Sequence, residues 1–89
     1  MPRRWTRYRK AAEQGQGEAQ YSVGMRYLLG QSGVQDKEEA VRWFKLAAAQ
    51  GIAMAQAALA LRYAKGEGVQ QDYVEAYKWA TLASSQAGQ

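Results

Sequence analysis

Small and apolar residues recur along the chain at helical spacing, in blocks that end at glycine. Within residues 17–29, Ala19, Val23 and Tyr27 fall on one strip, with Gly24 beside it. Such a strip is typical of the buried face of an amphipathic helix. A glycine inside a helix costs about 1 kcal/mol relative to alanine, so Gly24 needs a packing reason. We expect a neighbouring helix to cross there.

Four further blocks have helical character, and none of the chain has the alternating pattern of a strand. The helices from Asp36 and Asp72 each begin with an aspartate cap and carry a glutamate three residues later, which predicts a capping-box-like pair. Their apolar seams are Ala40, Trp43, Phe44 and Ala47 in one helix and Ala76, Trp79, Ala80 and Ala83 in the other. The predicted helices cover residues 3–14, 17–29, 36–50, 53–65 and 72 onward, with fraying from Ser84 to Gln89.

The chain repeats itself with a fixed period. Equivalent residues recur after 36 positions, at Gly30 and Gly66, Asp36 and Asp72, Ala40 and Ala76, and Trp43 and Trp79. A period in this range predicts an array of helical repeats. The predicted fold is all-α: one domain over residues 1–89, an alpha-alpha superhelix of antiparallel helix pairs. It has a half-repeat helix at 3–15 and repeats at 17–51 and 53–88, about two and a half repeats in five helices.

The repeated motif is Ala-x-x-x-(Leu/Val)-Gly/Ala-x-x-Tyr, then Gly-x-Gly-Val-x-x-Asp, then Ala-x-x-Trp-x-x-x-Ala-Ala. It resembles the Sel-one-like repeat, a relative of the tetratricopeptide repeat, from Ala19 to Gly51 and from Ala55 to Gln86. The resemblance implies a superhelical interaction scaffold of a kind often found in bacteria, generally without catalytic residues. The departures are Ala60 in place of the usual glycine, a longer turn at Gly30, and a weak match at Arg4 and Arg7.

The composition excludes several kinds of catalytic and metal-binding site. The chain of 89 residues has no cysteine and no histidine, which excludes disulfides, thiolate or imidazole metal ligands and the nucleophile–base pairs that use them. We therefore expect no enzyme activity, no metal and no cofactor. The formal charge is +4, and the basic excess lies in the first ten residues, at Arg3, Arg4, Arg7, Arg9 and Lys10. No apolar run predicts a membrane span or a signal peptide, so a cytoplasmic location is expected.

Several residues allow a chemical reading beside a structural one. Asp36 and Asp72 could be acids, but their equivalent positions favour helix caps. Gly66-Glu67-Gly68 resembles a phosphate loop, yet it lacks the preceding strand and the Lys-Ser/Thr ending of a P-loop. The aromatic residues at helical spacing could stack on bases, although core packing is the more common role of such a pattern. They are Tyr27, Trp43, Tyr63 and Trp79.

The predicted partner-binding site lies on the first helix of each pair. Glu18, Ser22 and Arg26, and their equivalents in the next repeat, are interpreted as a strip that points away from the apolar face. First helices line the concave groove of a solenoid, where a peptide would bind. Arginines flanked by apolar side chains suit a segment that carries carboxylates; as ordinary solvated residues they would have no such role. The predicted site residues are Ser22, Met25, Arg26, Leu29, Ala58, Leu61, Arg62 and Lys65.

The leading hypothesis is a non-enzymatic interaction module for a peptide or partner protein, without a small-molecule substrate. An alternative is self-association, as a dimer or by helix exchange, because solenoids usually need about three repeats and polar caps. A weaker alternative is a nucleic-acid contact through the basic N-terminal helix, where Arg3, Arg7 and Lys10 share a stripe near Trp5 and Tyr8.

Overall fold

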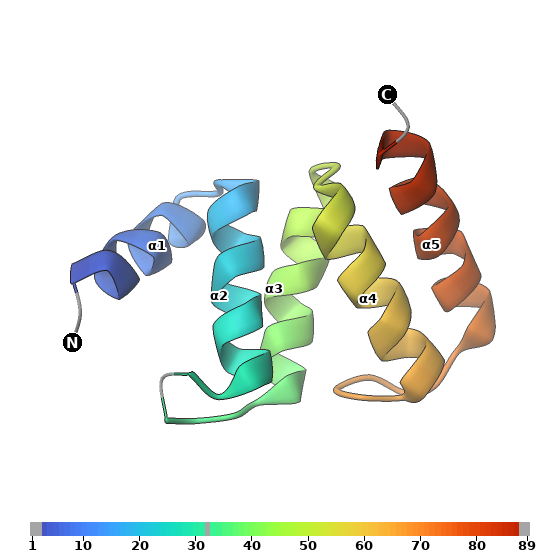
Figure 1. Cartoon of the computed structure of the whole chain (residues 1–89), viewed down its shortest axis with the longest axis horizontal. Coiled ribbons are helices and arrows are strands. Elements are labelled where there is room, and N and C mark those ends of the chain that lie inside the picture. The colour runs from blue at the N-terminus through green and yellow to red at the C-terminus, as the bar shows by residue number, and fades with distance from the viewer. Residues whose placement is uncertain (1–2, 32, 88–89) are drawn as a thin grey trace.

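The computed structural model describes residues 3–31 and 33–87, with side chains over 6–31 and 33–86. These residues form α-helices and contain no strand, so the all-α prediction is confirmed (Figure 1). The helices are α1 (Arg3–Glu13), α2 (Gly17–Leu29), α3 (Lys37–Ala49), α4 (Ala53–Lys65) and α5 (Tyr73–Ala87). The last helix continues to Ala87, and the predicted fraying from Ser84 is therefore wrong for residues 84–87. The end of that prediction, residues 88–89, lies outside the described part.

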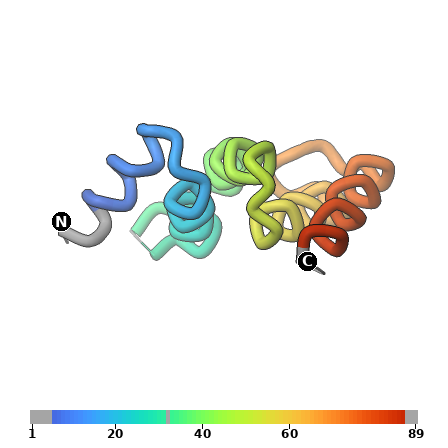
Figure 2. Tube along the Cα trace, turned by 90° about the horizontal axis from the view of Figure 1, so that it is seen from above, coloured from blue at the N-terminus to red at the C-terminus, as the bar shows by residue number. Residues whose placement is uncertain are grey.

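Each helix packs on the next one along the chain, which gives a stack and not a closed bundle (Figure 1). Seen from above, α2 and α4 lie on one side of the stack and α3 on the other (Figure 2). The Cα atoms extend over 38 × 28 × 17 Å, and the shortest extent fits two layers of helices about 8–10 Å apart. The predicted superhelix of helix pairs is confirmed. None of the described helices is both long and apolar enough to cross a membrane.

The turn between α2 and α3 satisfies the carbonyl groups that the end of α2 leaves open. The final carbonyls of a helix have no partner within it. Gly30 adopts the left-handed conformation (φ 69°) that closes many helices and that suits glycine. Three donors from the turn reach three successive carbonyls: Gly30 N–H to Arg26 O, Asp36 N–H to Tyr27 O at 2.9 Å, and Gln35 Nε2–H to Leu28 O at 2.9 Å.

The turn between α4 and α5 repeats this arrangement one period later. The bonds are Gly66 N–H to Arg62 O at 2.8 Å, Asp72 N–H to Tyr63 O at 3.0 Å, and Gln71 Nε2–H to Ala64 O at 2.8 Å. The other two connections, α1–α2 and α3–α4, are each bridged by an equivalent glutamine of the following helix. Gln20 Nε2–H donates to Ala12 O at 3.2 Å, and Gln56 Nε2–H donates to Ala48 O at 3.1 Å. The same hydrogen bonds therefore recur every 36 residues, with the period of the sequence.

The aspartate caps form as predicted, but the reciprocal half of the capping box does not. Asp36 Oδ1 accepts a bond from Glu39 N–H at 3.0 Å, and Asp72 Oδ1 accepts one from Glu75 N–H at 3.1 Å. The backbone N–H of each aspartate is already bonded to the preceding helix. The Glu39 carboxylate instead accepts a bond from Trp43 Nε1–H at 3.2 Å.

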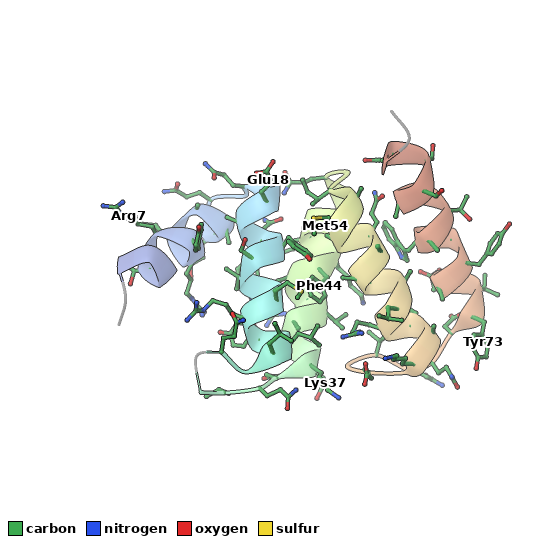
Figure 3. All side chains as sticks on the ribbon, viewed as in Figure 1. Arg7, Glu18, Lys37, Phe44, Met54 and Tyr73 are labelled. Atoms are coloured by element: carbon green, nitrogen blue, oxygen red, sulfur yellow. The ribbon has the colours of Figure 1, made fainter. Side chains whose placement is uncertain are left out.

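The main core lies between α2, α3 and α4 and centres on Phe44, which has no exposed surface (Figure 3). A Cβ built on Gly24 would lie 2.7 Å from Phe44 Cε1 and 3.2 Å from the Ala40 carbonyl oxygen. The mid-helix glycine thus allows α3 to cross α2 closely, as the sequence predicted. In the next repeat the equivalent pair is Ala60 and Ala80.

A second glycine holds the two repeats together. A Cβ on Gly68 would overlap the carbonyl oxygen of Lys37 and lie 2.7 Å from its carbonyl carbon and 2.9 Å from Val41 Cγ2. The turn before α5 therefore rests directly on the first turn of α3. Gly33, in the corresponding turn of the first repeat, would meet nothing within 4 Å.

These two glycines provide a matched test of the contact. Both have positive φ, 77° for Gly68 and 91° for Gly33, so alanine should cost about 1–3 kcal/mol at either position through backbone strain. We expect Gly68→Ala to cost a further 1–3 kcal/mol or so, because backbone atoms must move apart. Thermal and urea unfolding of both variants would measure the difference. Equal losses would contradict close packing at Gly68.

Candidate partner-binding surfaces

A cleft of about 360 Å³ lies between α2 and α4 on the side of the stack formed by the first helices. Its lining is almost entirely apolar: Tyr21, Met25, Leu28, Met54, Ala57, Ala58, Leu61 and Arg62. Four of the eight residues predicted for a binding site meet there, namely Met25, Ala58, Leu61 and Arg62. The helix pairs place them together because equivalent helices lie side by side in successive repeats.

The other four predicted residues do not line this cleft. Ser22 is half-buried, and its hydroxyl donates a bond to the Glu18 carbonyl oxygen at 3.1 Å. Arg26 is also half-buried, while Leu29 and Lys65 are exposed. Their part in partner binding stays a prediction.

Arg62 does not point away from the apolar face, and that part of the prediction is wrong. The side chain is buried, at 7% exposed, beside Ala55 and Leu59 on the same helix. These three positions are i, i+4 and i+7, which fall on one helical stripe. Arg62 Nη2 lies 3.5 Å from Glu67 Oε1, so the guanidinium already has a carboxylate partner.

Glu67 links Arg62 to the preceding helix pair. Its Oε2 atom accepts a hydrogen bond from Lys37 Nζ at 3.3 Å. The Lys37 ammonium, aided by the nearby positive charges of Arg62 and Lys65, lowers the pKa of the Glu67 carboxyl from its ordinary value. The ion pairs join the α4–α5 turn to the start of α3, where Gly68 makes its backbone contact. The sequence predicts Glu67 only as part of a turn, because its partner Lys37 lies 30 residues away along the chain.

A larger groove, which the sequence analysis did not predict, lies between α4 and α5. Its volume is about 720 Å³, and no charged residue is among those that line it. They are Ala53, Met54, Ala57, Ala60, Leu61, Ala64, Ala76, Tyr77, Ala80, Ala83 and Ser84. The sequence contains a signal for this groove. Ala80 is the equivalent of Phe44 in the preceding repeat, so the apolar face of α5 lacks a large side chain at this position.

The basic side chains of α1 are of two kinds: some are exposed, and one is hydrogen-bonded to other side chains. Arg7 and Lys10 are exposed, and Arg7 points away from the body (Figure 3). Arg9 donates a bond to the Tyr27 hydroxyl at 2.7 Å and lies 3.4 Å from Glu13. The side chains of Arg3, Arg4 and Trp5 lie outside the described part, so the predicted stripe is seen in part. Nucleic-acid binding stays a prediction.

The residues with a possible chemical role have structural partners. Asp36 and Asp72 cap helices, and the four aromatic residues at helical spacing pack against the core clusters, as predicted. Within the described residues, no three His, Cys, Asp or Glu side chains gather as a metal site would require. The two apolar hollows are therefore the candidate functional surfaces.

The Sel1 repeat family model matches residues 8–16, 17–52 and 53–87. The chain belongs to the Sel1 repeat family. This confirms the resemblance inferred from the repeated motif, and the fold is typically that of a non-catalytic scaffold for protein interactions. No curated protein matches the sequence.

Solved structures agree with this assignment. A protective antigen of uropathogenic Escherichia coli strains with an SLR fold is 46% identical, with a TM-score of 0.84 over 89% of this chain. A Sel1 repeat protein from Oxalobacter formigenes is 39% identical, with a TM-score of 0.85 over 89% of this chain. Helicobacter pylori cysteine rich protein B, 19% identical, shares the fold with a TM-score of 0.89 over 97% of this chain. The chain spans 17%, 59% and 66% of these proteins, respectively.

The Glu67 ion pairs make stability depend on pH. Because the pKa of Glu67 is lower in the folded protein, its ionised form stabilises the fold above about pH 4.3, the ordinary glutamate value. This contribution is lost as the pH falls through the folded pKa. We expect Glu67→Gln to lower Tm at pH 7, with a difference from the unsubstituted chain that narrows below about pH 4.

A suitable control is Glu13→Gln, which removes the same charge from an exposed pair within one helix. Exposed pairs of this kind are worth little, so the control should change Tm less than Glu67→Gln. A Tm loss for Glu67→Gln that stays constant down to pH 3 would contradict the ionic role.

Proposed function

We propose that this Sel1 repeat chain is a protein-interaction module whose α2–α4 cleft binds a peptide segment with apolar and acidic side chains. The observation that carries the proposal is the apolar cleft itself, which joins residues from two successive repeats. Concave sites with an apolar lining and a few polar groups are the usual form of a binding pocket. Met25 and Leu61 are its anchor positions for an apolar partner side chain.

Positive charge beside the cleft favours an acidic partner. Lys65 is exposed one helical turn after Leu61, and Arg26 follows Met25 directly in α2. Arg62 contributes less charge than its sequence position indicated, because Glu67 neutralises it. The acidic preference therefore depends most on the exposed Lys65, and it should weaken as the salt concentration rises. The cytoplasmic location expected from the sequence stays a prediction.

A random peptide library selected on the intact chain would test this function. We expect the enriched peptides to combine apolar and acidic residues and to bind Met25→Gln at least about tenfold more weakly, a loss of about 1.4 kcal/mol. The matched control is Leu46→Gln, which replaces an exposed apolar residue on α3, outside the cleft. Peptides that bind both variants equally would show that the cleft is not the site.

A further inference from the structure

The buried guanidinium at the α2–α4 cleft has an edge that is only partly used. Arg62 is 7% exposed, lines the cleft, and has its Nη2 atom 3.5 Å from Glu67 Oε1. Its Nε atom is buried too, and among the described residues no atom accepts a hydrogen bond from it. Nε–H and one Nη2–H leave a guanidinium on the same edge, where a carboxylate can accept two parallel hydrogen bonds. Glu67 therefore occupies only the Nη2 side of this edge.

The Glu67 carboxylate has a second partner, which it keeps if another acid takes Arg62. Its Oε2 atom accepts a hydrogen bond from Lys37 Nζ at 3.3 Å, and this bond is the main cause of the lowered pKa of Glu67. The Glu67 side chain is 31% exposed, so water also solvates it. Partly exposed ion pairs contribute little to stability. Release of Glu67 from Arg62 therefore costs little, whereas the buried Nε–H of Arg62 gains an acceptor that it lacks.

The first repeat has no acid at this position. The residue equivalent to Glu67 is Gln31, and each follows the glycine that closes a first helix. Their backbones are bonded alike, since Gln31 N–H donates to Arg26 O at 3.1 Å and Glu67 N–H donates to Arg62 O at 3.0 Å. The turn therefore accepts glutamine as well as glutamate, and the shared backbone geometry does not require the carboxylate of the second repeat.

We propose that Glu67 is an internal competitor for the carboxylate of the partner and thereby sets how strongly the cleft prefers acidic segments. A partner carboxylate that enters the cleft replaces Glu67 at Arg62 and accepts hydrogen bonds from Nε and Nη2 together, while Glu67 stays on Lys37. Because the lining around Arg62 is apolar, this carboxylate belongs to an aspartate or glutamate flanked by apolar residues. The inference rests on the proposed function, since it takes the cleft as the peptide-binding site.

Glu67→Gln, which gives the second repeat the residue of the first, tests the competition. The probes are a library peptide with one acidic residue, enriched on the unsubstituted chain, and the same peptide with that residue replaced by its amide. In fluorescence anisotropy at pH 7, we expect Glu67→Gln to bind the acidic peptide at least about fivefold more tightly, because Arg62 is released. The amide peptide should change by less than about twofold. Circular dichroism at the same temperature checks that the variant is folded.

The control for the change in net charge is Glu13→Gln, which removes a carboxylate from an exposed pair on α1. It should alter the binding of either peptide by less than about twofold, because exposed charges are screened by solvent and salt. No gain for Glu67→Gln, or an equal gain with both peptides, would overturn the competition.

Arg62→Lys combined with Glu67→Gln separates a direct contact from a general effect of charge. Lysine keeps the positive charge but cannot form the two-pronged bond, so the gain for the acidic peptide should fall below about twofold. A gain that persists with lysine would overturn Arg62 as the carboxylate-binding residue. In either negative case, weaker binding to Met25→Gln would still support the cleft as the site. A library without any peptide that Met25→Gln weakens would contradict the proposed function itself, and this inference with it.

Discussion

The carbonyl groups at the end of each first helix are the constraint on which the rest of the structure depends. Buried or half-buried carbonyls need donors, and the turn supplies three of them in order: a left-handed glycine, a glutamine side chain and the N–H of the capping aspartate. Since the aspartate is bonded to the preceding helix and also caps the next one, it sets where the next helix starts. The crossing of α2 and α3 then brings Phe44 onto Gly24. Stacking of the two pairs creates the α2–α4 cleft, whereas the α4–α5 groove lies within the second pair.

Features that arise within one or two neighbouring helices could be predicted from the sequence, whereas contacts that involve several elements could not. The helices, their aspartate caps and the role of Gly24 follow from spacing and propensity within one or two elements. The burial of Arg62 also has a local cause, its i+7 relation to Ala55, but the interpretation placed Arg62 on the outward strip because it is equivalent to Arg26. The Lys37–Glu67 pair joins segments 30 residues apart, so only the three-dimensional stack could show it. The groove lies within one repeat, and its signal in the sequence is the alanine at position 80 where the first repeat has Phe44.

The two candidate surfaces share one wall. Met54, Ala57 and Leu61 of α4 line the cleft on one side and the groove on the other. The α2 wall of the cleft and the α5 wall of the groove are otherwise separate, which makes the surfaces distinguishable by substitution. Family membership supports a scaffold, and the open hollow at Ala80 shows where this chain departs from its own internal repeat.

The contact between Gly68 and Lys37 has a mechanical consequence. A solenoid usually couples each unit to its neighbour through side chains that can slide. Here a backbone carbonyl rests against a glycine that has no side chain to yield, and the Glu67 ion pairs bridge the same joint. Bending at this joint would open the backbone contact and the ion pairs together. Backbone as well as side-chain contacts therefore oppose bending between the two repeats, and the same joint sets the distance and angle between α2 and α4, the two walls of the cleft.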